Sequence, residues 1–167
     1  RRKLVPIDLG GSPSGCAIAP PRRKLPSPQT IEALLQNYRE RWPERELEAA
    51  FFHGGVPSKA MLEATAGVPG RISLHPGDLT LKDAVALQIS GVETIELEVM
   101  TFDPHVLRTC RRQYTTGRVN EMVAKLKEIG FTVGAHLVPG LPGSGRLARE
   151  ADIEACASIG IDFIRIW

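Results

Sequence analysis

Hydrophobic and polar residues follow their clearest pattern between residues 94 and 143. Aliphatic and polar residues alternate over residues 95–99, and a period of two is expected of a β-strand. Apolar residues then recur at helical spacing over residues 119–129, and residues 131–138 form a second apolar stretch. This order predicts a strand, a connecting helix and a second, parallel strand.

The first of these strands also carries two carboxylates, Glu96 and Glu98, on the face opposite its aliphatic residues. If the sheet is open, this face contacts water. If the sheet closes into a barrel, the same face is the interior, where a carboxylate needs a partner.

The same order of strands and helices recurs along the whole chain. The expected strands are residues 4–9, 47–52, 70–74, 95–99, 131–138 and 162–167. The expected helices begin near Ser27 or Thr30, near Pro57, Thr80 and Asp103, near Thr115 or Thr116, and near Leu147. Ser, Thr and Asp favour helix N-terminal caps, and Asp83 lies three residues after Thr80, as in a capping box.

One junction between helix and strand is repeated. A glycine, an apolar residue and a polar residue precede three of the expected strands, beginning at Gly91, Gly130 and Gly160. Glycine there is typical of a helix C-terminus. Repeated βα units without a nucleotide-binding glycine motif predict an α/β fold, a partial (βα)6 TIM-type barrel with parallel strands. In such folds the site lies beyond the carboxyl ends of the strands.

One domain is expected across residues 1–167, with residues 1–9 as the first strand, 10–28 as a long loop and 30–167 as the remaining βα units. Loops of that length are usually functional or mobile. Because the chain stops on a strand, we expect it to be a fragment of a longer protein. Other domains of that protein, or a separate protein, are therefore the expected partners.

Composition narrows the function classes only slightly. The net charge of +2 does not indicate a nucleic-acid partner, and the basic clusters are interpreted as solvated surface. No apolar run is long enough to span a bilayer, and no signal-peptide pattern is present. Cys16, Cys110 and Cys156 are far apart, which argues against a disulfide framework and for the reducing cytoplasm.

Several segments match sequence motifs of a known family. They are Phe51-Phe52-His53-Gly54-Gly55, Phe102-Asp103, Arg112-Gln113-Tyr114-Thr115, Gly130-Phe131 and Gly140-Leu141-Pro142-Gly143. In these segments the chain resembles the radical S-adenosylmethionine (radical SAM) superfamily, most closely the branch of the Elongator catalytic subunit and oxygen-independent coproporphyrinogen oxidase. The resemblance implies a six-stranded partial barrel, an S-adenosylmethionine cofactor and a [4Fe–4S] cluster.

The same resemblance implies roles for single residues. Gly54 and Gly55 match the glycine motif that approaches the amino group of the cofactor. Arg112 matches an arginine that pairs with the cofactor carboxylate, and its alternative is a surface arginine on a helix. Glu98-Val99-Met100-Thr101 stands where the family usually has Gly-Val-Gln-Ser, which puts a carboxylate where the cofactor would pass. With His136, these residues are the candidate cofactor-binding set.

The loop after the first strand departs from the family. The family holds its cluster there with three cysteines spaced CxxxCxxC, whereas this chain has Ser12, Cys16 and Ala19. Cluster irons are held by thiolates, so a lone cysteine predicts no cluster of the family's type. Cys110 and Cys156 fall in expected helices and are interpreted as small core residues.

Three histidines suggest a different kind of site. His53, His75 and His136 follow or end the second, third and fifth expected strands, and Glu98 lies on the fourth. Imidazoles and a carboxylate at one barrel mouth could bind zinc or another divalent metal. Alternatively, His136 hydrogen-bonds within the interior.

Three functions therefore remain open. The first is a radical-SAM-like pseudoenzyme with a degenerate iron–sulfur loop, acting as a scaffold, a partner-binding domain or a cofactor-binding module. The second is an active radical enzyme with engineered or atypical cluster ligands. The third is a metal-dependent barrel hydrolase using His53, His75 and His136. No residue is assigned a catalytic role, and no substrate is inferred.

Overall fold

The computed structural model describes residues 4–9, 26–52 and 56–167. The loop positions Ser12, Cys16 and Ala19, and the segment His53-Gly54-Gly55, lie outside the described residues. The roles expected for those residues therefore stay predictions.

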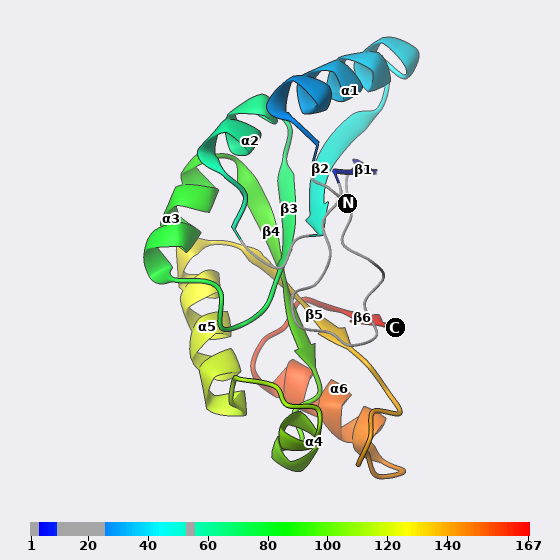
Figure 1. Ribbon diagram of the computed structural model, residues 1–167, viewed down its shortest axis with the longest axis vertical. Helices are drawn as coiled ribbons and strands as arrows, with labels where there is room; N and C mark the ends of the chain where they lie inside the picture. Colours follow the sequence, from blue (N-terminus) through cyan, green and yellow to red (C-terminus); the bar gives the residue numbers. More distant parts are fainter. Residues whose placement is uncertain (1–3, 10–25, 53–55) are drawn as a thin grey trace.

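Within the described residues, parallel strands form one sheet whose spatial order follows the chain order, β1-β2-β3-β4-β5-β6 (Figure 1). The strands are β1 (Leu4–Asp8), β2 (Glu46–Phe52), β3 (Gly70–Leu74), β4 (Val92–Met100), β5 (Thr132–Leu137) and β6 (Phe163–Ile166). Each neighbouring pair is parallel. The sheet curls into a half-barrel, so the predicted partial (βα)6 barrel is confirmed.

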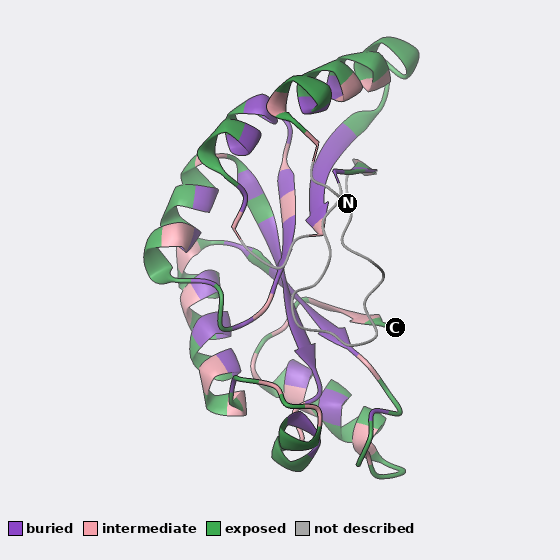
Figure 2. Ribbon diagram, viewed as in Figure 1, coloured by how far each residue is buried: buried purple, intermediate pink, exposed green. Residues whose placement is uncertain are grey.

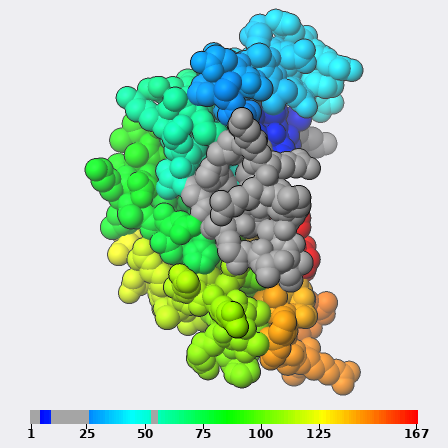
Figure 3. All heavy atoms as spheres, in the orientation of Figure 1, coloured from blue at the N-terminus to red at the C-terminus, as the bar shows by residue number. Residues whose placement is uncertain are grey.

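Helices connect the strands and cover the outer face of the sheet. They are α1 (Pro28–Arg41), α2 (Lys59–Ala64), α3 (Leu81–Ile89), α4 (Pro104–Thr109), α5 (Thr116–Ile129) and α6 (Ala148–Ser158). In Figure 1, α1, α2, α3 and α5 follow one another along one side, and α4 and α6 lie at the end away from α1. Figure 3 shows the same succession along the rim of the molecule. The opposite face of the sheet is called the inner face below.

The hydrophobic core lies between the sheet and these helices. Ile95, Leu97 and Val99 of β4 are fully buried there, beneath α3 and α5. Fully burying one such side chain stabilises a fold by about 1.5–3 kcal/mol. Figure 2 shows buried positions along the sheet and exposed positions on the outward sides of the helices. Because side chains alternate along a strand, Glu96 and Glu98 lie on the inner face.

The helix ends follow the predicted capping chemistry. Ser27 caps α1 and is followed by Pro28, and Asp103 caps α4 through its side chain. Thr80 and Asp83 form the predicted capping box at the start of α3. None of the helices in the described residues has the length and apolar character needed to span a membrane.

The start of β4 was not predicted from the alternation. β4 begins at Val92, which pairs with Gly70, and a register shift follows between Gly70 and Arg71. A β-carbon at position 70 would lie 3.0 Å from Cγ2 of Val92, so glycine permits this close approach. This register shift breaks the alternation at the start of β4, so the alternation predicts only residues 95–99 as strand.

Gly134 of β5 makes room for an aromatic ring on the inner face. A β-carbon at position 134 would lie 2.4 Å from Cζ of Phe163 in β6. The guanidinium carbons of Arg71 and Arg165 lie 5.5 and 5.9 Å from the centroid of that ring. Both guanidinium groups are thus within the range of a cation–π interaction with this ring.

Candidate functional site

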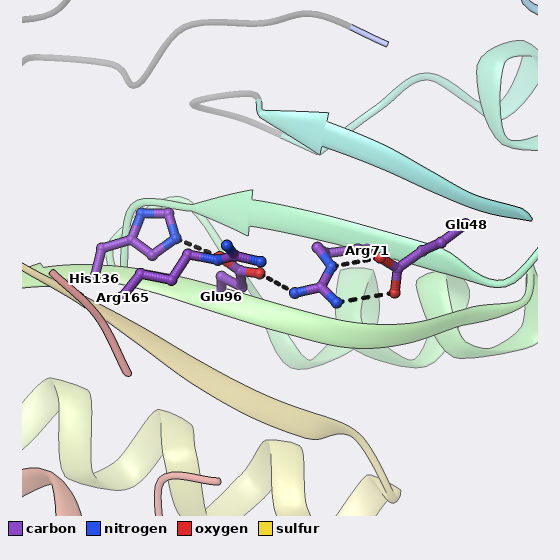
Figure 4. A network of polar contacts seen from close by, with 5 residues as sticks. All are labelled: Glu48, Arg71, Glu96, His136 and Arg165. Carbon is purple, nitrogen blue, oxygen red and sulfur yellow. Dashed lines mark hydrogen bonds and ion pairs between the residues drawn. The ribbon is translucent and has the colours of Figure 1, made fainter. Parts of the chain in front are cut away.

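A row of polar side chains crosses the inner face of the sheet (Figure 4). Five neighbouring strands, β2 to β6, contribute one side chain each: Glu48, Arg71, Glu96, His136 and Arg165. We call this set the interior row.

Two carboxylates and three nitrogen-bearing side chains pair along the interior row. Arg71 donates from Nε and Nη2 to Glu48, at 2.8 and 3.1 Å, and from Nη1 to Glu96. The second oxygen of Glu96 accepts from Nε of Arg165 at 2.8 Å and contacts Nε2 of His136. A buried carboxylate is stable only with such partners, so the row meets the requirement that the barrel interior imposes on Glu96.

Glu96 is fully buried, yet it is held in its charged form. Burial raises the pKa of its carboxyl, but hydrogen bonds from His136, Arg165 and Arg71 outweigh that effect and lower the pKa to about 2. A depressed carboxyl pKa stabilises the fold above the ordinary carboxyl pKa. That stabilisation is lost as the pH falls toward about 2.

A second group of polar residues lies at the carboxyl ends of β3 and β4. It consists of Ser73, His75, Glu98, Arg112 and Tyr114. We call this set the strand-end group. Ser73 and Glu98 lie on adjacent strands, and the segment between α4 and α5 contributes Arg112 and Tyr114. Sites in barrels of parallel strands form at this edge of the sheet.

Tyr114 ties the strand-end group to the backbone of β4. Its buried hydroxyl donates to the carbonyl oxygens of Glu98, at 3.2 Å, and of Val99. The ring of His75 packs against it edge to face, with centroids 4.9 Å apart. Nδ1 of His75 accepts from the backbone N–H of Gly77 at 3.1 Å, and burial lowers the pKa of the imidazole. The neutral ring with its proton on Nε2 fits these contacts.

The backbone at the end of β4 is strained. Met100 has φ of 63°, and the N–H of Thr101 donates to the carbonyl oxygen of Val99 at 2.8 Å. This tight turn is rare for a residue other than glycine. The Arg112 guanidinium contacts the Met100 thioether, so the turn and the arginine are positioned together.

Glu98 is the unusual member of the strand-end group. Its side chain is buried, and among the described residues Oε2 has no hydrogen-bond partner; the same is true of Oγ of Ser73. Burial raises the pKa of the Glu98 carboxyl to about 7, although the charge of Arg112 lowers it and that of Asp78 raises it further. The acid is therefore close to half-ionised near neutral pH.

The predicted site residues fall into two separate places. Glu98, Arg112 and His75 come together in the strand-end group, whereas His136 belongs to the interior row and contacts Glu96. No group of three histidine, cysteine or acidic side chains that could hold a metal occurs among the described residues. The set that includes His53 lies partly outside them, so the metal hypothesis rests on the sequence alone.

The described cysteines, Cys110 and Cys156, pack into the protein interior or against apolar side chains. Cys156 is buried in α6, and burial raises the pKa of its thiol to about 12, with the charge of Asp152 adding to the effect. Cys110 follows α4 and packs against a small apolar cluster of Met100, Val106 and Leu141. Both positions suit structural cysteines, because a cluster needs exposed or converging thiolates.

Several residues of both groups were missed by the sequence analysis. They are Glu48, Arg71, Ser73 and Arg165. Because side chains alternate between the two faces of a strand, the sequence can place each of these residues on the inner face. Which of them meet depends on the pairing of strands, which a single sequence does not reveal.

Two curated proteins match the chain at low identity. The heme chaperone HemW of Lactococcus lactis is 26% identical over 157 residues, which cover 83% of this chain and 41% of that protein. The tRNA-2-methylthio-N(6)-dimethylallyladenosine synthase of Myxococcus xanthus is 29% identical over 120 residues, covering 66% of this chain and 26% of that protein. The chain therefore spans less than half the length of these relatives. It matches no protein-family model.

Solved structures share the fold. The archaeal Elp3 of Methanocaldococcus infernus superposes with a TM-score of 0.74 at 15% identity, over 99% of this chain and 46% of that chain. Coproporphyrinogen III oxidase (HemN) of Escherichia coli, described as a radical SAM enzyme, superposes with a TM-score of 0.63 at 20% identity. That match covers 83% of this chain and 36% of the oxidase. At these identities the superpositions show the fold alone.

Proposed function

We propose that this chain is a domain of the radical S-adenosylmethionine superfamily that binds S-adenosylmethionine without a [4Fe–4S] cluster, as its fold and its curated relatives favour. The observation that carries the proposal is the single thiol at Cys16, between Ser12 and Ala19, in the loop after β1. Three irons of a cluster need three protein thiolates, and this loop offers one.

The rest of the described chain does not supply the missing ligands. Cys110 and Cys156 belong to helical segments and pack into apolar surroundings. The donor set therefore does not fit a cluster, and we assign no radical step to this domain.

The strand-end group supports retention of the cofactor. S-adenosylmethionine carries a sulfonium, an ammonium and a carboxylate. Arg112 offers a guanidinium suited to a carboxylate, and Ser73 and Glu98 offer buried oxygen atoms that lack a protein partner among the described residues. Gly54 and Gly55 would approach the amino group, as the family resemblance implies.

The domain would serve a larger assembly. The relatives extend well beyond the part that this chain matches, which favours further domains or a separate protein as the partner. In this role the half-barrel is a scaffold or partner-binding module in the cytoplasm that presents a bound cofactor.

Calorimetric titration of the metal-free protein with S-adenosylmethionine tests the proposal. In buffer containing EDTA, we expect saturable binding and a rise in Tm, because a ligand that binds only the folded state stabilises it. A Cys16→Ala variant should bind equally well, since no thiolate takes part. The absence of both binding heat and a Tm shift at millimolar ligand would contradict the proposal.

A further inference from the structure

Two oxygen atoms inside the half-barrel lack the partners that buried polar groups normally have. Glu98 is 5% exposed and Ser73 is 2% exposed, and neither Oε2 of Glu98 nor Oγ of Ser73 meets a donor or acceptor among the described residues. More than nine in ten buried polar groups in folded proteins are satisfied. Two exceptions on one face of adjacent strands therefore suggest a group that is supplied from outside the protein.

The strand pairing makes Ser73 and Glu98 diagonal neighbours on the inner face. Ser73 pairs with Glu96, and Glu98 lies two residues further along β4 on the same inner face. Diagonal neighbours of this kind are within reach of longer side chains. The Tyr114 hydroxyl donates to the carbonyl oxygen of Glu98, which fixes the backbone from which the Glu98 side chain projects.

The two carboxylates of β4 differ in the charge that surrounds them. Glu96 meets Arg71, Arg165 and His136 directly, whereas the only cation that acts on Glu98 in its described surroundings is Arg112, whose guanidinium also contacts Met100. Asp78 acts on Glu98 in the opposite sense. The site at Glu98 is thus short of positive charge, while the site at Glu96 is fully compensated.

We propose that the Glu98 carboxylate, assisted by the Ser73 hydroxyl, binds a positively charged centre of S-adenosylmethionine, and that this residue lets the domain favour cationic over neutral ligands. The inference rests on the proposed function. A cationic centre supplies the missing partner for Oε2 and favours the ionised acid. Sulfonium and ammonium are the two centres of the cofactor that carry such a charge.

Three ligands and two variants distinguish a contact with the sulfonium from a contact with the ammonium. S-adenosylmethionine carries both cations, S-adenosylhomocysteine keeps only the ammonium, and 5′-methylthioadenosine carries neither. Each is titrated by calorimetry at about pH 8, where Glu98 is mostly ionised, into the unaltered protein, Glu98→Gln and Glu93→Gln. Glu93 is an exposed carboxylate on the same strand and serves as the matched control.

The unaltered protein and Glu93→Gln should lose affinity by roughly tenfold or more at the step that removes the cation contacted by Glu98, as expected for a buried bond to a charged group. Glu98→Gln should lose that part of the preference, whereas discrimination that comes from the ligand carboxylate and Arg112 should remain. A preference for S-adenosylmethionine over S-adenosylhomocysteine that Glu98→Gln abolishes identifies the sulfonium. A preference for S-adenosylhomocysteine over 5′-methylthioadenosine that is abolished identifies the ammonium.

Ser73→Ala provides a second, smaller perturbation and should weaken the same preference only in part. A preference that survives unchanged in Glu98→Gln, or equal binding of all three ligands by the unaltered protein, overturns the inference and leaves the proposed function intact. Failure of the unaltered protein to bind any of the three ligands overturns both.

Discussion

Arg71 lies between two buried carboxylates, Glu48 and Glu96, and donates to both. Replacing it with alanine leaves two buried acids short of a partner, which should lower the free energy of unfolding by about 3 kcal/mol. Urea denaturation measures the change. The control is Arg45→Ala, whose exposed pair with Glu44 should contribute less than about 1 kcal/mol. Equal losses in the two variants would show that the interior row does not stabilise the fold.

Glu98 should make stability fall as the pH rises through neutrality. Burial raises its pKa in the folded state to about 7, so the folded protein binds more protons than the unfolded protein between about pH 4.5 and pH 7. Stability from the neutral acid is therefore full at low pH and is lost as the pH passes about 7.

The Glu98→Gln variant isolates this effect in the protein without ligand. It should be more stable than the unaltered protein at about pH 8, by up to about 3 kcal/mol, with a smaller difference at about pH 5. Urea denaturation at both pH values measures the difference. A difference that is the same at both pH values, or larger at the lower one, would mean that Glu98 is ionised throughout.

Single residues differ in how far the sequence predicts them. Alternation placed Glu96 and Glu98 on one face, and a barrel interior required a partner for Glu96, which the structure supplies. The identity of those partners, Arg71 and Arg165, depends on strand register across the sheet. The unpartnered state of Glu98 could not be predicted either, because it results from packing around the whole strand-end group.

At the scale of one element, α5 offers a paired test of its two glycines. Gly130 ends the helix with φ of 105°, a left-handed conformation that disfavours a β-carbon although nothing nearby would clash. Gly117 lies in the first turn, where a β-carbon would only approach Thr115 Oγ1, at 3.8 Å.

The same substitution should therefore act in opposite directions at the two ends of α5. Gly130→Ala should destabilise the protein by about 1 kcal/mol, and Gly117→Ala should stabilise it by up to about 1 kcal/mol. Thermal denaturation of both variants checks the signs. Two changes of the same sign would mean that backbone conformation does not decide the effect.

Helix caps and strand ends depend on the sequence over different distances. The capping box of Thr80 and Asp83 and the left-handed Gly130 depend on residues within a few positions of one another. Strand ends depend on a neighbour distant in sequence, as the pairing of Val92 with Gly70 shows. Likewise, the residue before β6, Asp162, exchanges two hydrogen bonds with Val133 of the adjacent strand: its backbone N–H donates to the Val133 carbonyl oxygen, and its carboxylate accepts from the Val133 N–H.

At the scale of the molecule, a half-barrel of parallel strands is combined with a segment after β1 that has one cysteine, Cys16. The fold follows from repeated βα units and was predictable from the repeated glycine junctions. The interior row and the strand-end group show two uses of that interior. One compensates buried charge within the protein, and the other leaves two buried oxygen atoms, on Ser73 and Glu98, without a hydrogen-bond partner among the described residues.

Anaerobic reconstitution with iron and sulfide is the most direct test of the central claim that this domain functions without a cluster. We expect a colourless protein with far less than one iron retained per chain after desalting, because Cys16 alone cannot hold the cluster. A stable brown protein with about four irons per chain, lost in a Cys16→Ser variant, would contradict the account.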